Sequence, residues 1–345
     1  MTYSQHSLSR RGLLAAGGAA GLGALLAACG GGKDETGSSP AASGAAAGSW
    51  SFTDDQPKEL KADKVPSKIV AFTGTAAALV DLGLQDKIVG VFGETKKADG
   101  TAEDQAGDLD ISKVEIVGNK WGEFSVEKYA ALAPELLITH QFDPGNYWYV
   151  PDESKDQIVK LAQVATVNVG RVPLNKPIER YAELAKALGA DLNAPKVAEA
   201  KARFEKAAAD LTAAAKASGG VKVLFGSGSA DIFYVSSAAV SSDLMYFKEL
   251  GVDLIMPEVK GADYYESLSW ENAGKYHADI IFLDARPGDP LQPKDLASKP
   301  GWSALPAVKA NQVFPWQPVP IYSWAGAAPL LEALAAAITK SKKLA

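Results

Sequence analysis

Cysteine and histidine are scarce in this sequence, and their scarcity excludes two kinds of site. Cys29 is the single cysteine among 345 residues, so no internal disulfide can form and a disulfide scaffold is excluded. The three histidines are His6, His140 and His277. Zinc and manganese sites are built from several converging histidines or carboxylates. We therefore expect no metal site formed by the protein alone.

Basic residues are also in the minority. The chain has 35 Lys and Arg against 41 Asp and Glu, which gives a formal net charge of -6. Nucleic-acid binding requires a basic surface to meet the phosphates, so we expect no nucleic-acid partner. Hydrophobic residues make up 47% of the chain, which is enough to bury a large core and excludes disorder of the whole chain.

The motifs of common enzyme classes are missing as well. Residues 226–231 begin like a dinucleotide-binding loop but carry Asp231 where the third glycine should stand. No P-loop, His-Glu-x-x-His, calcium-loop or Gly-x-Ser-x-Gly spacing occurs. We expect no catalytic residues and no enzymatic activity. A cell-surface hydrolase or a sensor is the alternative from a different class, and a hydrolase would need a nucleophile–base pair.

The N-terminus resembles an export signal of the twin-arginine type. In residues 1–28, Arg10-Arg11 precede an apolar run of Leu, Ala and Gly. The run ends in Leu26-Ala27-Ala28-Cys29, which resembles a bacterial lipobox. We expect Cys29 to be lipidated and residues 29–60 to form a flexible tether. The body would then be lipid-anchored and extracytoplasmic, at the outer face of the cytoplasmic membrane.

From about residue 66 the chain alternates short apolar runs with helical patterns, which favours parallel sheets covered by helices. A long helical pattern begins at Pro195 and ends before Gly219. We predict the α/β class, with two Rossmann-like lobes of mostly parallel sheets joined by a single long α-helix. The N-terminal lobe would span 61–194, the connecting helix 195–218 and the C-terminal lobe 219–345.

The two halves echo each other in sequence. Ser125-Val126-Glu127 leads to an apolar run at 134–138, and Ser269-Trp270-Glu271 leads at the same spacing to a run at 278–282. The echo pairs His140 with Asp284, and Phe142 with Arg286. Both loops would follow the carboxyl end of a strand, which is where ligands bind in open α/β sheets.

Aromatic residues gather in the loops that follow predicted strands, in segments rich in proline and glycine. Core burial is the alternative for each one, but loops of this kind carry function, and an aromatic cleft with a few polar anchors suits a bulky small molecule. Two arginines at strand ends could anchor ligand oxygens. The candidate ligand-binding residues are Trp121, Tyr147, Trp148, Arg171, Tyr234, Tyr264, Tyr265, Arg286, Trp316, Tyr322 and Trp324.

Five ordered motifs carry a family resemblance over roughly residues 64–340. They lie at residues 66–71, 82–91, 125–138, 247–252 and 302–309. With them, the chain resembles the substrate-binding lipoproteins of ABC importers for iron siderophores, haem and vitamin B12. The resemblance implies a ligand cleft between two lobes, an ABC permease as partner, a monomer and no turnover.

The family leaves the ligand open, so charge must decide. Ferric tris-catecholates carry about three negative charges, and only Lys120, Arg171 and Arg286 lie near the predicted cleft. Ferric hydroxamates are neutral or cationic, so we predict a ferric hydroxamate of the ferrioxamine type. Its iron arrives already chelated, and no cofactor is needed. Haem is the second reading, with Tyr264, Tyr265 or His140 as axial ligand, and cobalamin is the third.

Overall fold

The computed structural model describes residues 48–261, 263–286, 288 and 290–344. These residues belong to one compact unit. The predicted export signal and the lipidation site at Cys29 lie outside the described residues. Within the part that is described, no helix is long and apolar enough to cross a membrane.

The N-terminal lobe is built on a five-stranded sheet in which every neighbouring pair is parallel. Its strand order is β5-β4-β3-β6-β7, with bounds β3 (Ile69–Phe72), β4 (Ile88–Phe92), β5 (Glu115–Gly118), β6 (Leu136–Gln141) and β7 (Gln163–Asn168). Strands β3 and β6 are buried along their whole length, because helices cover both faces of a parallel sheet.

The alternation of side chains along these strands assigns each helix to a face. Helices α1 (Thr73–Asp81) and α4 (Asn175–Ala187) share a hydrophobic cluster with Ile69, Ala71 and Ile138. On the opposite face, α2 (Val126–Ala131) and α3 (Lys155–Leu161) share a cluster with Val70, Phe72 and Leu137. Short 3-10 helices complete the lobe at Gln85–Lys87, Asp104–Ala106 and Ile111–Lys113.

The C-terminal lobe is built on a mixed sheet of order β10-β9-β8-β11-β12. Its strands are β8 (Val223–Gly228), β9 (Ile232–Ser236), β10 (Tyr265–Ser269), β11 (Ile280–Asp284) and β12 (Val313–Trp316). Strands β8, β11 and β12 are parallel, and β9 and β10 join as antiparallel strands. Its helices are α6 (Ser242–Glu249), α7 (Pro293–Leu296) and α8 (Pro306–Lys309), with 3-10 turns at Trp270–Lys275 and Trp302–Ala304.

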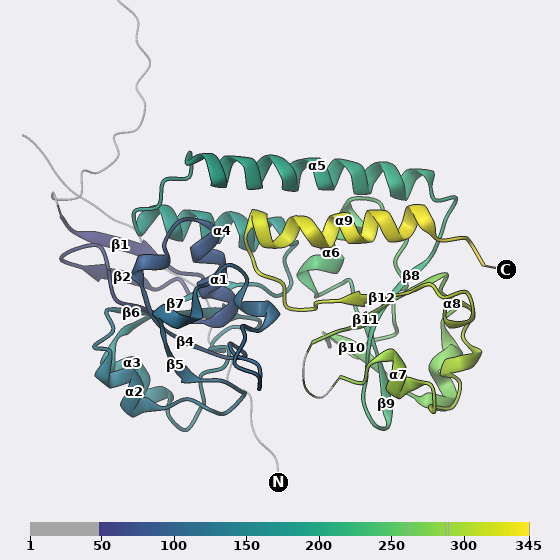
Figure 1. The fold of residues 1–345 in the computed structure, drawn as a ribbon, viewed down its shortest axis with the longest axis horizontal. Helices are drawn as coiled ribbons and strands as arrows, with labels where there is room; N and C mark the ends of the chain where they lie inside the picture. The colour runs from purple at the N-terminus through teal and green to yellow at the C-terminus, as the bar shows by residue number, and fades with distance from the viewer. Residues whose placement is uncertain (1–47, 262, 287, 289, 345) are drawn as a thin grey trace, which may run out of the picture. The chain divides into compact units, whose positions relative to one another are not determined.

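The predicted connecting helix is observed as α5 (Pro195–Ala217). Helix α9 (Trp324–Lys340), near the C-terminus, lies alongside it (Figure 1). An ion pair of 2.7 Å between Arg203 and Glu332 joins the two helices. Two lobes of mostly parallel strands joined by one long helix confirm the predicted fold class.

One predicted boundary needs correction. The expected tether, 29–60, includes strand β1 (Trp50–Thr53) and most of the hairpin that it forms with β2 (Glu59–Ala62). Trp50 and Leu60 are buried, and the Asp54 carboxylate accepts hydrogen bonds from the backbone and hydroxyl of Thr166 in β7. The folded lobe therefore begins at Trp50, because alternate residues of the hairpin bury against it.

The echo between the two halves has a structural counterpart. Strand β6 lies between β3 and β7, and β11 lies between β8 and β12. Both strands are the fourth in their sheets. An α-helix, α2, follows Ser125, whereas only a 3-10 helix, at Trp270–Lys275, follows Ser269. The correspondence therefore holds for the strands and weakens between these helices.

Candidate functional site

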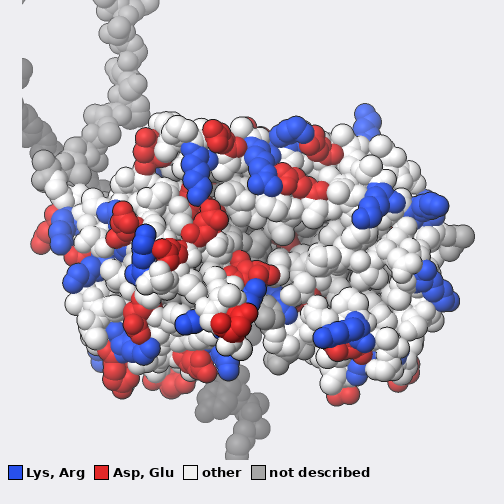
Figure 2. Space-filling model, in the orientation of Figure 1, with Lys and Arg blue, Asp and Glu red and all other residues white. Residues whose placement is uncertain are grey.

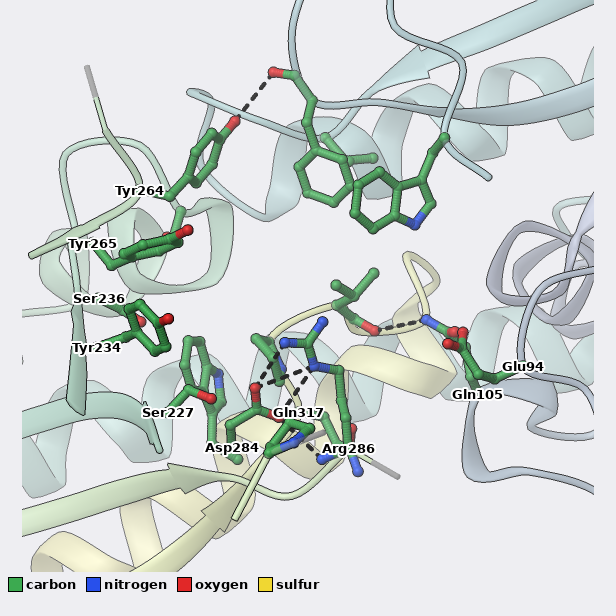
Figure 3. Close-up of a pocket in the computed structure, with 18 of the residues that line it drawn as sticks. Glu94, Gln105, Ser227, Tyr234, Ser236, Tyr264, Tyr265, Asp284, Arg286 and Gln317 are labelled. Carbon is green, nitrogen blue, oxygen red and sulfur yellow. Dashed lines mark hydrogen bonds and ion pairs between the residues drawn. The ribbon is translucent and has the colours of Figure 1, made fainter. Parts of the chain in front are cut away.

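A cavity of about 840 Å³ is lined by residues of both lobes. Much of its wall comes from the segments that follow the carboxyl ends of strands. Glu94 follows β4, Arg286 follows β11 and Gln317 follows β12 (Figure 3). In the same way Phe142 follows β6 and Ser229 follows β8. This is the edge at which open α/β sheets bind ligands. The cavity is large enough for a drug-sized or somewhat larger molecule.

Aromatic side chains make up about a third of the described lining. They are Trp121, Phe142, Trp148, Tyr149, Tyr234, Tyr264, Tyr265, Trp316 and Tyr322. Four of them form one cluster on the N-terminal lobe, with ring centroids 4.6 Å apart for Phe142–Trp148 and 5.2 Å for Trp121–Trp148. Trp121 is 63% exposed, which is unusual for the largest apolar side chain unless a ligand covers it.

The described lining is acidic. Its carboxylates are Glu94, Glu103, Asp104, Asp143 and Asp284, and Arg286 is its one basic side chain. Arg171 pairs with Asp143, and Lys97 with Asp104, from just outside the lining. Even with these two partners counted, carboxylates outnumber basic groups. Lys120, which the sequence placed near the cleft, is exposed and lies outside the described lining.

Arg286 is held in place by a neighbouring carboxylate. Its guanidinium donates to both oxygens of Asp284, at 2.7 Å for the shortest contact, and Asp284 is only 1% exposed. Because Asp284 neutralises it, Arg286 offers the cavity fixed N–H donors without adding net positive charge.

A second polar contact faces the cavity from the N-terminal lobe. The Tyr149 hydroxyl donates to the Glu94 carboxylate, and Tyr149 has a positive φ of 64°. Burial and the adjacent Glu94 raise the pKa of the Tyr149 phenol, so it stays protonated. Glu94 is a residue that the sequence analysis did not select. Its position directly after a buried strand was the signal that could have found it.

Most of the predicted ligand-binding residues lie in the cavity wall. Eight of them line it: Trp121, Trp148, Tyr234, Tyr264, Tyr265, Arg286, Trp316 and Tyr322. Arg171 reaches it indirectly, since it pairs with Asp143 and lies 4.9 Å from the ring centre of Tyr264.

Two further predicted residues, Tyr147 and Trp324, do not line the cavity. Tyr147 packs against the core of the N-terminal lobe, with the Lys155 ammonium 4.4 Å from its ring centre. Trp324 is the first residue of α9 and packs against the main core, with Lys201 above its ring.

His140 is also absent from the described lining of the cavity, although its ring packs against Tyr322 of the wall. It is fully buried, and its Nδ1 lies 2.7 Å from the Tyr181 hydroxyl, which in turn contacts Thr75. Burial lowers its pKa to about 3, so the ring is neutral. Strand β6 runs one residue past His140, which keeps this side chain in the core. His140 therefore does not face a ligand, and its reading as a haem ligand is corrected.

The described residues hold no group of three or more His, Cys, Asp or Glu side chains arranged to bind a metal ion. The described lining consists mainly of aromatic side chains and carboxylates, with Arg286 held in place by Asp284.

The sequence profile of the periplasmic binding protein family matches residues 69–320, and the chain belongs to this family. It is therefore a substrate-binding protein and not an enzyme. The family resemblance noted from the sequence motifs is confirmed.

Three individual proteins show what this chain is similar to within and beyond the family profile. The crystal structure of DesE, a ferric-siderophore receptor protein from Streptomyces coelicolor, is 51% identical, with a TM-score of 0.81, over 86% of this chain and 100% of that one. The Fe(3+)-citrate-binding protein YfmC of Bacillus subtilis (strain 168) is 28% identical over 193 residues, and the match spans 56% of each chain. The petrobactin-binding protein YclQ from Bacillus subtilis, 19% identical with a TM-score of 0.65 over 85% of this chain and 99% of that one, shares the fold.

Proposed function

We propose that this protein captures a ferric siderophore outside the cytoplasmic membrane and delivers it to an ABC permease for iron uptake. The similarity to DesE over its whole length supports a siderophore as the ligand. The observation that carries the proposal is the cavity itself, which combines aromatic walls with an excess of carboxylates.

Charge selects the class of siderophore. A ferric tris-catecholate carries about three negative charges, and in a partly desolvated cavity each carboxylate within a few ångströms would repel it. Ferric hydroxamates are neutral or cationic and present apolar chains. The ferrioxamine type is therefore our proposed ligand. The carboxylates of haem meet the same repulsion, and Tyr264 already donates its hydroxyl to the Phe142 carbonyl at 3.1 Å.

Different residues of the cavity would contact different parts of the chelate. The aromatic walls would contact the apolar chains of the chelate, and Arg286 would donate to its oxygens. The chelate saturates the coordination sphere of the ferric ion, so the protein needs no metal ligand of its own. Iron is here the cargo, recognised through the shape and charge of its organic shell.

The remaining parts of the proposal concern location and partners. The lipobox at Cys29 would carry the lipid anchor, and the twin-arginine signal would direct export. The body would then bind its chelate as a monomer at the outer face of the membrane and dock on the permease. A Cys29→Ala variant would test the anchor, because it removes the thiol that would be lipidated and should release the protein from the membrane fraction.

The binding proposal is tested by tryptophan fluorescence, since Trp121, Trp148 and Trp316 line the cavity. The soluble chain from residue 45 onward is titrated with a ferric trishydroxamate, its iron-free form, a ferric tris-catecholate and haem. We expect saturable quenching at submicromolar concentration with the ferric hydroxamate alone. Quenching by the ferric tris-catecholate alone would reject the assignment of a hydroxamate as the ligand. A shifted Soret band would move the assignment to haem. No change in fluorescence with any of the four compounds would reject the proposal that the ligand is a siderophore.

A further inference from the structure

Asp243 is a buried carboxylate directly behind the cavity wall. It lies in the first turn of α6 and is 1% exposed. Its Oδ2 accepts a hydrogen bond of 2.7 Å from the indole N–H of Trp316, and its Oδ1 accepts one of 2.9 Å from the backbone N–H of Leu244. Trp316 lines the cavity, whereas Asp243 is not among the described lining residues.

These two bonds place a strict demand on the side chain at position 243. Both of its oxygens face N–H donors, so the site needs two acceptors. An ionised carboxylate supplies both, whereas a carboxamide of the same shape would turn an NH₂ group toward one of the donors. A buried donor that loses its acceptor is costly. The Leu244 N–H is fixed in the backbone of α6, whereas the indole N–H belongs to a side chain whose rotamer can change.

The surroundings of Asp243 connect it to the junction of the lobes. The backbone N–H of Arg171 donates to the Val240 carbonyl at 2.8 Å, and that of Leu174 donates to the Ser242 carbonyl at 2.9 Å. The Ser242 hydroxyl lies 3.4 Å from that of Tyr322, another residue of the cavity wall. The start of α6 is thus fixed to the N-terminal lobe on one side and to the binding wall on the other.

We propose that Asp243 is a positioning residue for ligand binding, which holds the Trp316 indole in the orientation that the ferric chelate requires. This inference rests on the proposed function for its ligand, and on the two hydrogen bonds for its mechanism. Asp243 does not touch the chelate. It acts through Trp316, so its loss and the loss of Trp316 should affect the same step.

The protonation of Asp243 gives the proposal a pH signature. Burial raises its pKa to about 6, although the bonds from Trp316 and Leu244 oppose the shift. The titratable group that faces it is Tyr322, whose own pKa burial raises, so the phenol stays neutral. As pH falls through about 6, Asp243 gains a proton and one oxygen ceases to be an acceptor. The indole should then loosen and chelate affinity should fall.

The first test needs no ligand. In purified protein labelled with ¹⁵N at tryptophan, the indole N–H resonance of Trp316 is assigned by its disappearance in Trp316→Phe. We expect it to shift with pH with a midpoint near 6, and to lose that dependence in Asp243→Asn. An indole resonance at the same position in the wild-type protein and in Asp243→Asn at pH 8 would overturn the proposal, whatever the ligand proves to be.

The second test is a double-mutant cycle on the affinity for a ferric trishydroxamate. We expect Asp243→Asn to weaken binding about tenfold, and to add little in a Trp316→Phe background. Asp253→Asn, which changes an exposed aspartate of the same lobe, is the matched control. Equal losses in both backgrounds would refute a role through Trp316.

The two tests also separate the failure of the inference from that of the proposed function. If Asp243→Asn fails to fold, as judged by thermal unfolding, the affinity of Trp316→Phe, which lacks the indole N–H, decides instead. An affinity for the ferric trishydroxamate equal to that of the wild-type protein contradicts the proposal. If the wild-type protein binds no ferric hydroxamate, the proposed function fails, while the indole resonance still decides the link between Asp243 and Trp316.

Discussion

At the carboxyl end of β6, residues two positions apart have different environments. His140 lies in the core, and Phe142 lies in the cavity wall. The sequence analysis offered His140 as a possible haem ligand and did not select Phe142, because a strand end cannot be located from the sequence to within one or two residues. Most of the aromatic residues of the site were predictable, since they lie in loops after strands or at the ends of strands, although Tyr234 lies within β9. The position of the strand end was not.

The neutral, buried His140 should make stability depend on pH. Its pKa is near 3 when folded and near 6.5 when unfolded, so the unfolded chain binds the extra proton. The free energy of unfolding should therefore fall by roughly 1.4 kcal/mol per pH unit from this group as pH drops from 6.5 toward 3. His140→Asn keeps a hydrogen-bonding group beside Tyr181 but does not titrate. Urea unfolding of both proteins at pH 7, 5.5 and 4.5 measures the difference, and parallel pH curves would contradict it.

Glu94 tests the electrostatic part of the site. Glu94→Gln keeps a side chain that can accept from Tyr149 but removes one negative charge from the lining. We expect the affinity for a cationic ferric hydroxamate to fall about threefold at low salt, and by less at high ionic strength, because salt screens the interaction. Calorimetric titration at two salt concentrations measures both effects. Glu115→Gln, at an exposed carboxylate outside the described lining, is the control and should leave the affinity unchanged. A gain of affinity in Glu94→Gln would contradict the proposal that carboxylates in the lining favour a cationic ligand.

Among the elements, the buried parallel strands were the easiest to predict. Strands such as β3 and β6 are buried on both faces and so appear in the sequence as continuous apolar runs. Strand β9 alternates partly buried with buried residues, and β10 has a single buried residue, Leu268; neither strand appears as a continuous apolar run, and the sequence analysis missed both. The hairpin β1–β2 was missed for a similar reason, since only alternate residues of it are buried.

Helix α9 depends on a buried cap. The Ser323 hydroxyl accepts from the Gly326 N–H at 2.9 Å and also donates to the Asp81 carboxylate on α1. Both side chains are buried, and burial raises the pKa of Asp81. Ser323→Ala should lower the free energy of unfolding by about 1–3 kcal/mol, since the cap is lost and Asp81 loses its partner.

Chemical denaturation measures this loss against a matched cap in the other lobe. Ser125 caps α2 at a partly exposed site, where its hydroxyl accepts from the Lys128 N–H. Ser125→Ala should cost about 1 kcal/mol or less. Equal losses for the two variants would mean that the contact of Ser323 with Asp81 contributes nothing.

At the scale of the whole molecule, the cavity depends on contacts between residues far apart in the sequence. The Gln105 amide donates to the Val319 carbonyl across 214 positions, at 3.2 Å. Such a contact brings Glu103 and Asp104 to the same cavity as Trp316. No local sequence pattern predicts a contact of this kind, so Glu103 and Asp104 were absent from the sequence prediction. The two-lobed fold and most of the aromatic wall depend on local patterns and were predicted.

One bond between the lobes should control how long a chelate stays bound. The Tyr264 hydroxyl on the C-terminal lobe donates to the Phe142 carbonyl on the N-terminal lobe, and both residues line the cavity; Figure 3 draws the bond as the dashed line at Tyr264. Tyr264→Phe removes this bond and keeps the ring, so we expect the dissociation rate of the ferric chelate to rise several-fold with a smaller change in the association rate. Stopped-flow fluorescence measures both. Tyr246→Phe, on α6 and outside the described lining, is the control, and an unchanged dissociation rate in Tyr264→Phe would exclude this role.

Acidic and basic side chains are interspersed over the visible face of the protein (Figure 2), whereas carboxylates outnumber basic groups in the described lining of the cavity. The account therefore predicts selection of ligands by charge at the cavity.

The most direct measurement is calorimetry on one linear ferric trishydroxamate in three forms, with its free amine cationic, acetylated to neutral, or succinylated to negative. The iron centre and the apolar chains are the same in all three. The account predicts that the cationic form binds at least as tightly as the neutral one, and that the negative form binds about tenfold or more weakly. Equal affinity for all three, or tightest binding of the negative form, would contradict it.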